Sequence, residues 1–393
     1  MLNQRIFITL FLAVFVTTTG MGLVAPLLPV YAHELGAGSF QIGLIFGAFS
    51  LSRSVFVPYF GRLSDRKGKK PLMTTGLFFY FFLSLPYVAA KNVEALILLR
   101  LAHGFASAMI LPVAQAYVGM MIPSQKEGRI MGFFNLSLYG GLSFGPLLGG
   151  VVRDWFNIQI SFFSMAALTL IAFFLCLLLL PTETKQDREY ARGEEQRIPY
   201  LELIKSAPVV SLFIFRVCFT ICIGIIWAFL PLLASTKLGL SSSAIGVVVM
   251  INVLVAGLLQ APMGMLADRF SKKLLVTAGG VLGIFSVLYI NAASSFGELV
   301  LANGLLGLAG GTAIPSIMAL GVIEGRRTEA MGGMMGFLAL AHSIGMLVGP
   351  LLAGVLIDSS SFETIFILGA VIMGSGTLIF WYFSDKKGIG YKA

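Results

Sequence analysis

The sequence has few charged residues for its length. Only 11% of its 393 residues are charged, 57% are hydrophobic, and the mean hydropathy is +0.92. Soluble domains carry about 25% charged and roughly 45–50% apolar residues. This composition excludes a soluble enzyme, a disordered chain and a secreted disulfide scaffold. It indicates an integral membrane protein.

Cysteine is also scarce. Cys176, Cys218 and Cys222 all lie in apolar stretches and have no histidine or acidic neighbour. Such cysteines behave as small hydrophobic residues. The sequence therefore predicts no metal site, no redox pair and no cofactor.

Long charge-free stretches predict the membrane-spanning helices. A bilayer core about 30 Å thick needs roughly 20 apolar residues per helix. Nine charge-free stretches reach this length, and three more do so with one arginine each (Arg53, Arg100 or Arg216). These twelve stretches are 6–32, 35–61, 71–90, 95–117, 130–152, 155–182, 206–236, 238–267, 274–297, 299–323, 330–357 and 364–384.

The basic residues predict the orientation in the membrane. An even number of spans places both termini on one side, and 21 of the 27 Lys and Arg residues then fall on that side. Only Lys91, Arg153 and Lys237 fall on the other. By the positive-inside rule, both termini are expected in the cytoplasm, with the protein in the cytoplasmic (inner) membrane. The net charge of +9 then needs no nucleic-acid partner.

The two halves of the sequence repeat. A shift of about 203 residues superposes Asp65-Arg66 on Asp268-Arg269 and Gly145-Pro146 on Gly349-Pro350. A polar, mixed-charge stretch separates the halves. We therefore expect an all-α membrane protein with two six-helix bundles, 1–181 and 206–393, joined by a cytoplasmic linker, 182–205. Parallel repeats of this kind place a substrate site between the halves.

Four motifs carry a family resemblance. They are GRLSDRKGKK at 61–70, its degenerate copy GMLADRFSKK at 264–273, LLRLAHGFASA at 98–108 and GLSFGPLLGG at 141–150. The sequence resembles the major facilitator superfamily, and the fourth motif is typical of its twelve-span drug:proton antiporter branch. The resemblance covers essentially the whole chain.

The resemblance implies a conformational latch. A carboxylate at Asp65 can hold the positive N-terminal end of the helix predicted at 330–357, near Met331. Asp268 would hold the helix predicted at 130–152, near Arg129. Alternatively, the basic residues of these loops only set the topology. The latch candidates are Gly61, Asp65, Arg66, Gly68, Asp268 and Arg269.

The residues that couple transport to protons are harder to assign. The family links an arginine at the position of Arg100 to coupling, and a charge inside the membrane is a functional candidate because its burial is costly. Many antiporters of the family have a carboxylate inside helix 1, where this sequence has threonines 17–19. A lone histidine is more often a core residue than a proton carrier. The other coupling candidates are His33, Glu34, Asp154, His103 and His342.

The substrate cavity is expected between the halves. We expect Arg53, Arg100 and Arg216 to lie toward the cytoplasmic half, where each could line the cavity or extend toward the membrane surface. The cavity candidates are Phe15, Thr18, Arg53, Gln115, Asn135, Arg216, Trp227, Asn303 and also His342.

Glycines and a proline concentrate in the helix predicted at 130–152. Pro146 removes a backbone hydrogen bond, and small residues allow close helix contact. This cluster predicts either a bend that seals the ion path or close packing against the helix predicted at 238–267. Its members are Gly141, Gly145, Pro146, Gly149 and Gly150. Residues 141–145 also fit a G-x-S-x-G nucleophile pattern, but no strand precedes them. The sequence therefore does not indicate an enzyme.

These observations favour a secondary transporter that exports amphipathic organic compounds by proton antiport and alternating access. The expected partners are a small-molecule substrate, protons and the lipid bilayer, with the protein a monomer. One alternative keeps the fold and changes the substrate to an organic anion, a phosphorylated metabolite or a lipid-like compound, bound by the intramembrane arginines. A receptor or an intramembrane enzyme is disfavoured, because no catalytic set is present and the duplicated latch motifs suit alternating access.

Overall fold

A computed structural model of the chain describes residues 4–120, 127–182, 203–327, 331–357 and 361–384. The side chains of residues 65, 127–129, 326 and 331–332 also lie outside the described part. Most of the predicted linker 182–205 is outside it as well.

The described residues of the first half form seven long or medium helices, one short helix and one 3-10 turn. Their bounds are α1 (Gln4–Val24), α2 (Leu27–Glu34), α3 (Ser39–Lys67), α4 (Lys69–Ser84), η1 (Leu85–Ala89), α5 (Val93–Ala108), α6 (Leu111–Met120), α7 (Glu127–Trp155) and α8 (Ile158–Leu179). Those of the second half are α11 (Ala207–Thr236), α12 (Ser242–Arg269), α13 (Lys272–Ala292), α14 (Phe296–Arg327), α15 (Met331–Ile357) and α16 (Phe362–Phe383).

Local sequence explains where several helices begin and break. Asn92 and Asn157 accept the backbone N–H of the residue three positions on, at 2.9 Å each, and so cap α5 and α8. Pro26 separates α1 from α2 within one predicted span, and α5 gives way to α6 just before Pro112. Proline cannot donate the helical hydrogen bond, so the chain breaks at these points.

Eleven stretches of the described chain are long and apolar enough to cross a membrane, where the sequence predicts twelve. The remaining long helix, α7, has 29 residues but contains several glycines and serines. It packs along α1 and α12, so much of its surface meets protein and not lipid. The fold is therefore the expected all-α membrane fold of twelve long helical units.

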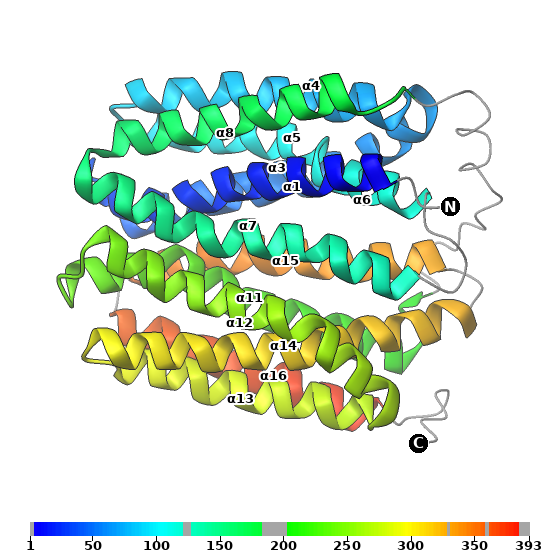
Figure 1. Cartoon of the computed structure of the whole chain (residues 1–393). Helices are drawn as coiled ribbons and strands as arrows, with labels where there is room; N and C mark the ends of the chain where they lie inside the picture. The colour runs from blue at the N-terminus through cyan, green and yellow to red at the C-terminus, as the bar shows by residue number, and fades with distance from the viewer. Residues whose placement is uncertain (1–3, 121–126, 183–202, 328–330, 358–360, 385–393) are drawn as a thin grey trace.

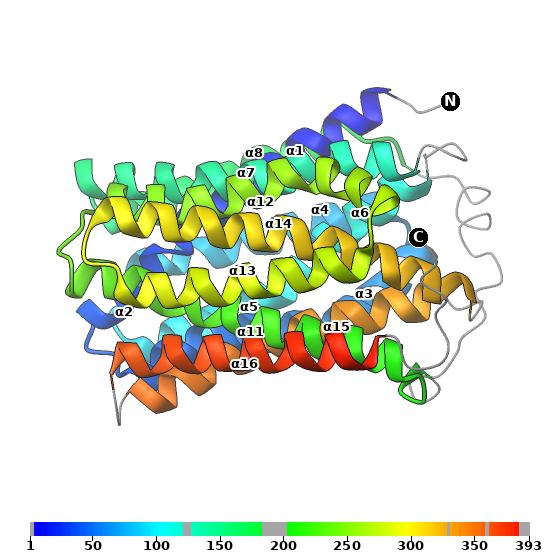
Figure 2. The ribbon, with the colours of Figure 1, turned by 90° about the horizontal axis from the view of Figure 1, so that it is seen from below.

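The helices form two groups that meet along four helices. Figure 1 draws α1 and α3–α8 in the upper part of the view and α11–α16 in the lower part. Across the boundary, α7 packs on α12 and α3 packs on α15, and α2 touches α11. The start of α1 and the end of α16 lie at the same end of the bundle (Figures 1 and 2), which we call the terminal end; the opposite end is the far end.

The two groups repeat one internal contact. Thr18 donates its hydroxyl to the carbonyl of Ser137, joining α1 to α7, at 3.4 Å. Thr220 donates to the carbonyl of Ala341, joining α11 to α15, at the same 3.4 Å. Glycines 141 and 345 make room for these threonines, since a Cβ at either would collide with the hydroxyl. The sequence repeat is thus a structural repeat.

Candidate functional site

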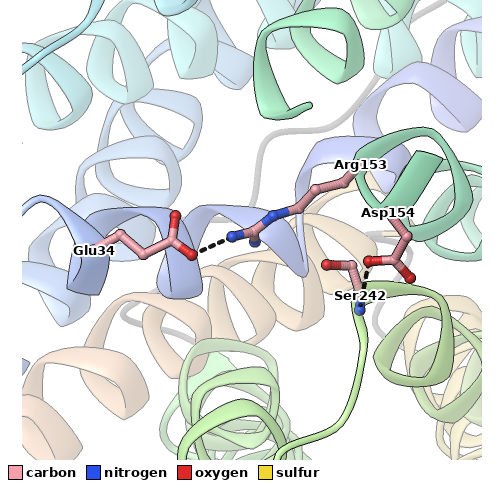
Figure 3. Close-up of polar contacts among 4 residues, drawn as sticks. All are labelled: Glu34, Arg153, Asp154 and Ser242. Carbon is pink, nitrogen blue, oxygen red and sulfur yellow. Dashed lines mark hydrogen bonds and ion pairs between the residues drawn. The ribbon is translucent and has the colours of Figure 1, made fainter. Parts of the chain in front are cut away.

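A hydrogen-bonded contact joins the two halves at the far end. Both carboxylate oxygens of Asp154, at the end of α7, accept backbone N–H groups at the start of α12: Ser242 at 3.0 Å and Ser243 at 2.7 Å. Figure 3 shows the contact with Ser242. The N-terminal end of a helix carries partial positive charge, so a carboxylate there is stabilising. Partial burial raises the pKa of Asp154, but the hydrogen bonds from Ser243 and Ser242 outweigh it and lower that pKa below its ordinary value.

A second charged contact lies beside the first. Arg153 of α7 forms an ion pair with Glu34 at the end of α2, also shown in Figure 3. Glu34 is exposed, and so is its neighbour His33. This pair stays within the first half, so it fixes α2 on α7, whereas Asp154 bridges the halves.

Glycines bring the two halves together next to this contact. A Cβ added at Gly246 of α12 would strike the Pro146 carbonyl of α7, and one at Gly43 of α3 would strike the Pro350 carbonyl of α15. These two contacts are equivalent by the repeat. Further along, Gly257 packs on the Tyr139 side chain, whose Cβ lies 2.6 Å from an added Cβ. Only glycine allows backbones to approach this closely.

The same faces of α3 and α12 lose their close contacts toward the terminal end. Gly264 follows Gly246 by 18 residues and Gly61 follows Gly43 by 18, which is about five helical turns, so each pair shares one face. Among the described residues, nothing lies within 4 Å of a Cβ added at Gly61, Gly132 or Gly264. The halves are therefore in close contact at the far end and separate near the terminal end.

Three of the five predicted helix-bend residues face α1. Gly141, Gly145 and Gly149 pack against the α1 backbone between Phe15 and Leu23. The expectation of packing against the helix predicted at 238–267 is wrong for these three, because their spacing of four residues keeps them on the face of α7 that meets α1. Gly150 meets Ser242 of α12, and the Pro146 carbonyl meets Gly246. Helix α7 thus uses small residues toward both neighbours.

The predicted latch residues lie at the terminal end. Gly68 has φ +98° in the turn between α3 and α4, a conformation that favours glycine. Arg66, Asp268 and Arg269 are exposed, and the Asp65 side chain lies outside the described residues. The equivalent turn of the second half uses Ser271, which caps α13 by accepting the Leu274 N–H at 3.4 Å.

Arg100 is held within the first half. Its Nε donates to the Ile45 carbonyl at 3.3 Å, and its guanidinium lies over the Phe49 ring, 4.2 Å from the centroid. Arg100 lies two turns from the start of α5, at the far end. The expectation that it shares a half of the membrane with Arg53 and Arg216 is wrong, because α5 runs away from the far end while Arg53 comes late in α3.

Arg53, Arg216 and His342 come from three different helices and lie near one another. The charges of Arg216 and Arg53 both act on the His342 imidazole. Arg53 Nε, Arg216 Nε and His342 Nδ1 are enclosed and have no hydrogen-bond partner among the described residues. All three side chains are half-buried. They form a basic cluster between α3, α11 and α15.

His103 has a different setting. Its ring stacks between Tyr80, with centroids 4.1 Å apart, and Tyr87, at 5.1 Å. Its Nε2 lies 3.4 Å from Ser84 Oγ. These partners belong to α4 and η1, and His103 itself belongs to α5, so its ring is enclosed inside the first half and away from the boundary.

A pocket at the boundary brings together some of the predicted cavity residues. Trp227 and Asn303 line it, whereas Phe15 and Thr18 pack against α7 glycines, and Gln115 and Asn135 are half-buried on α6 and α7. The full lining is Ala25, Pro26, Ile226, Trp227, Leu230, Pro231, Val249, Asn252 and Asn303. Among the described residues, no group of three His, Cys, Asp or Glu side chains could hold a metal ion.

Three polar boundary residues were not among the predicted site residues. Asn252 donates to the Asn303 carbonyl at 3.3 Å, and Gln260 donates to the Tyr139 hydroxyl at 3.3 Å. In the sequence, Asn252 and Gln260 could have been found as polar side chains in the middle of the charge-free stretch that forms α12.

This repeat, with its contacts at one end and a polar boundary between the halves, defines a membrane transporter. The protein-family model of the Major Facilitator Superfamily matches residues 10–235 and 212–392 of the chain. The chain belongs to the Major Facilitator Superfamily, whose members are transporters.

Relatives and solved structures agree with this assignment. The chain is 29% identical over 368 residues to an uncharacterized MFS-type transporter of Methanocaldococcus jannaschii, covering 91% of this chain and 92% of the relative. It is 27% identical over 369 residues to the multidrug resistance protein MdtG of Enterobacter lignolyticus, covering 91% and 87%. The crystal structure of the nucleoside transporter NupG superposes with a TM-score of 0.79 at 15% identity, covering 97% and 100%, which shows the shared fold.

Proposed function

We propose that the protein exports amphipathic organic compounds across the cytoplasmic membrane by alternating access, driven by the proton gradient. The observation that carries alternating access is the asymmetry of the glycine contacts. A Cβ added at glycine 43 or 246 would strike the opposite half, while one added at glycine 61 or 264, on the same faces, has no described residue within 4 Å. Halves that meet at one end only can rock to meet at the other.

The terminal end is proposed to be the cytoplasmic side. Support comes from the 21 basic residues on that side against three on the other. In this orientation the described conformation is closed to the outside by the Asp154 contact. The bundles 1–181 and 206–393, the linker 182–205, and a monomeric state are part of the same proposal.

The substrate proposal rests on the boundary pocket and on relatives. Ile226, Trp227 and Leu230 give the pocket an apolar wall, and Asn252 and Asn303 add amide groups. Such a wall suits the apolar part of an organic compound, and a few polar groups orient it. The MdtG relatives are named multidrug resistance proteins, which supports export of several compounds.

Proton coupling is proposed from the resemblance to the antiporter branch. His342 is the favoured proton carrier, because it lies at the boundary and an imidazole can both take up and release a proton. Arg100 and His103 are enclosed within the first half, and His33, Glu34 and Asp154 lie at the far end. For closure at the terminal end, the proposed latch is Gly61, Asp65, Arg66 and Gly68, with Asp268 and Arg269 as its copy.

Reconstitution tests the proposal. Purified protein in proteoliposomes is given an imposed pH gradient, and uptake of fluorescent amphipathic compounds is followed with and without an uncoupler. Expected is uptake that requires the gradient and stops with the uncoupler. Transport that proceeds at the same rate without a gradient would exclude proton coupling. No transport of any amphipathic compound by folded protein would overturn the export proposal.

A further inference from the structure

The basic cluster of Arg53, Arg216 and His342 lies where three helices meet. Gly47 of α3 packs on Leu347 and Leu351 of α15, with the nearest atoms 3.2–3.4 Å from an added Cβ. Because these helices run in opposite directions, Arg53, six residues beyond Gly47, comes level with His342. On the third helix, the Thr220 hydroxyl lies 2.7 Å from the Arg216 carbonyl and 3.4 Å from that of Ala341, which precedes His342.

Among the described residues, no ion pair joins an acidic side chain to this cluster. The sequence has no Asp or Glu in residues 35–64, 130–153, 203–267 or 330–357. These ranges cover the membrane-spanning parts of α3, α7, α11, α12 and α15. A charge taken out of water without a partner is costly.

Arg100 shows that this situation is not general to arginines in this fold. It also lies within a span, but it donates to the Ile45 carbonyl at 3.3 Å and lies over the Phe49 ring. Arg53 and Arg216 have neither kind of partner among the described residues, and Nε of each is enclosed. Two guanidiniums on helices of different halves, each with an Nε that has no partner among the described residues, suit a carboxylate or a phosphate group, whose oxygens can accept from both.

We propose that Arg53, Arg216 and His342 bind the acidic group of the exported compound, which makes the substrate an amphipathic organic anion. This inference rests on the proposed function and adds the charge of its substrate. Helix α11 carries both Arg216 and, eleven residues further, Trp227 of the boundary pocket. An amphipathic acid therefore has guanidiniums for its head and an apolar wall for its body along one helix. The same acidic chemistry occurs in free organic acids and in anionic lipid headgroups.

Equilibrium binding to the full-length protein tests the proposal. The probes are 1-naphthylacetate and 1-naphthylmethylammonium, which share a ring system and differ in charge. Binding is measured by calorimetry in phosphatidylcholine nanodiscs, with and without phosphatidylglycerol. Expected is tighter binding of the anion, weakened about tenfold or more by Arg53→Gln with Arg216→Gln, since a hydrogen bond to a charged group is worth about one such factor. Arg5→Gln, an exposed arginine of α1, is the matched control and should change nothing.

Each outcome of the binding experiment supports or overturns one part of the proposal. Anion binding that is lost in the double variant and unaffected by phosphatidylglycerol supports a free organic acid, and competition by phosphatidylglycerol supports the site with a lipid headgroup as its occupant. Equal affinity for both probes, preference for the cation, or an unchanged affinity in the double variant overturns the proposal. Should the double variant misfold, the two single Gln variants replace it, with Arg53→Lys and Arg216→Lys expected to lose less.

Transport separates this inference from the proposed function. Anion binding without transport would leave the site and remove the export proposal. Gradient-driven transport of the cationic probe, with no binding of the anionic one, would leave export and remove the site.

Discussion

The carboxylate of Asp154 accepts the backbone N–H of Ser242 at 3.0 Å and so ties the end of α7 to the start of α12. The two residues belong to different halves and lie 88 positions apart in the sequence. The bond can exist only while the far end is closed, because it spans the boundary that must open there. It is therefore a reporter of the conformation as well as a contributor to it.

Asp154→Asn should favour opening of the far end. A carboxylate at a helix N-terminus contributes about 0.5–1 kcal/mol in an exposed setting, which is roughly a two- to fivefold change in population. The measurement is the labelling rate of a cysteine introduced at Val249, which lines the boundary pocket. Glu34→Gln is the control, because it breaks a contact within one half. Unchanged labelling in Asp154→Asn would show that the glycine contacts alone hold this end.

The Asp154 contact should be insensitive to pH near neutrality. Its pKa is lowered by hydrogen bonds from Ser243 and Ser242, so the carboxylate binds its proton less readily in the closed state. The stabilisation is fully present above the ordinary aspartate pKa and is lost only as the pH falls through the lowered value. The reactive thiolate fraction of the introduced cysteine itself rises with pH, so the measured quantity is the ratio of Val249 labelling in Asp154→Asn to that in the wild-type background. This ratio should be constant between pH 6 and 8, and a change in that window would point to another titrating group at this end.

Gly246→Ala and Gly264→Ala should have opposite effects, although both change the same face of α12. A Cβ at Gly246 strikes the Pro146 backbone, so its cost should be about 1–3 kcal/mol in the described conformation. A Cβ at Gly264 meets nothing among the described residues, and alanine stabilises a helix by about 0.5–1 kcal/mol over glycine. Thermal unfolding in detergent should show a lower Tm for the first variant and an unchanged or higher Tm for the second. Equal destabilisation by both would contradict the separation of the halves at the terminal end.

Asp65→Asn should leave membrane abundance normal and impair transport. The change removes a charge with almost no change in size, and the proposed latch needs that charge at the start of α15. A cysteine at Gly132, where nothing described lies within 4 Å of an added Cβ, reports opening of the terminal end. Asp268→Asn is the matched variant in the second half. Wild-type transport in Asp65→Asn would mean that the loop serves topology alone.

His103→Phe and His342→Phe should separate structure from proton coupling. Phenylalanine preserves the stack on Tyr80 and loses only the contact with Ser84, so His103→Phe should cost about 1 kcal/mol of stability and leave the pH dependence of transport unchanged. His342→Phe should change that pH dependence. The measurement is transport rate against pH in proteoliposomes, and a loss of pH dependence in His103→Phe alone would reverse the assignment.

The membrane spans could be predicted because hydropathy is a local property. The stretch 206–236 predicts α11, observed as Ala207–Thr236, and the break at Pro26 and the caps at Asn92 and Asn157 follow from residues within one turn. The family could be predicted from the motifs at 61–70 and 141–150, since these are continuous in the sequence. Each of these features depends on neighbours along the chain, so no knowledge of packing is needed to find it.

The partners across the bundle were decided only by the tertiary structure. The sequence shows Asp154 as an acidic residue near a helix end, but not that α12 begins opposite it. It shows three arginines in the spans, but not that Arg100 has the Ile45 carbonyl while Nε of Arg53 and of Arg216 has no partner among the described residues. The glycines of α7 likewise divide between α1 and α12 according to the rotation of that helix. Hydrophobic burial and backbone hydrogen bonding specify that a helix forms; which side chains meet depends on the rotation and depth of each helix against its neighbours, and many residues set these together.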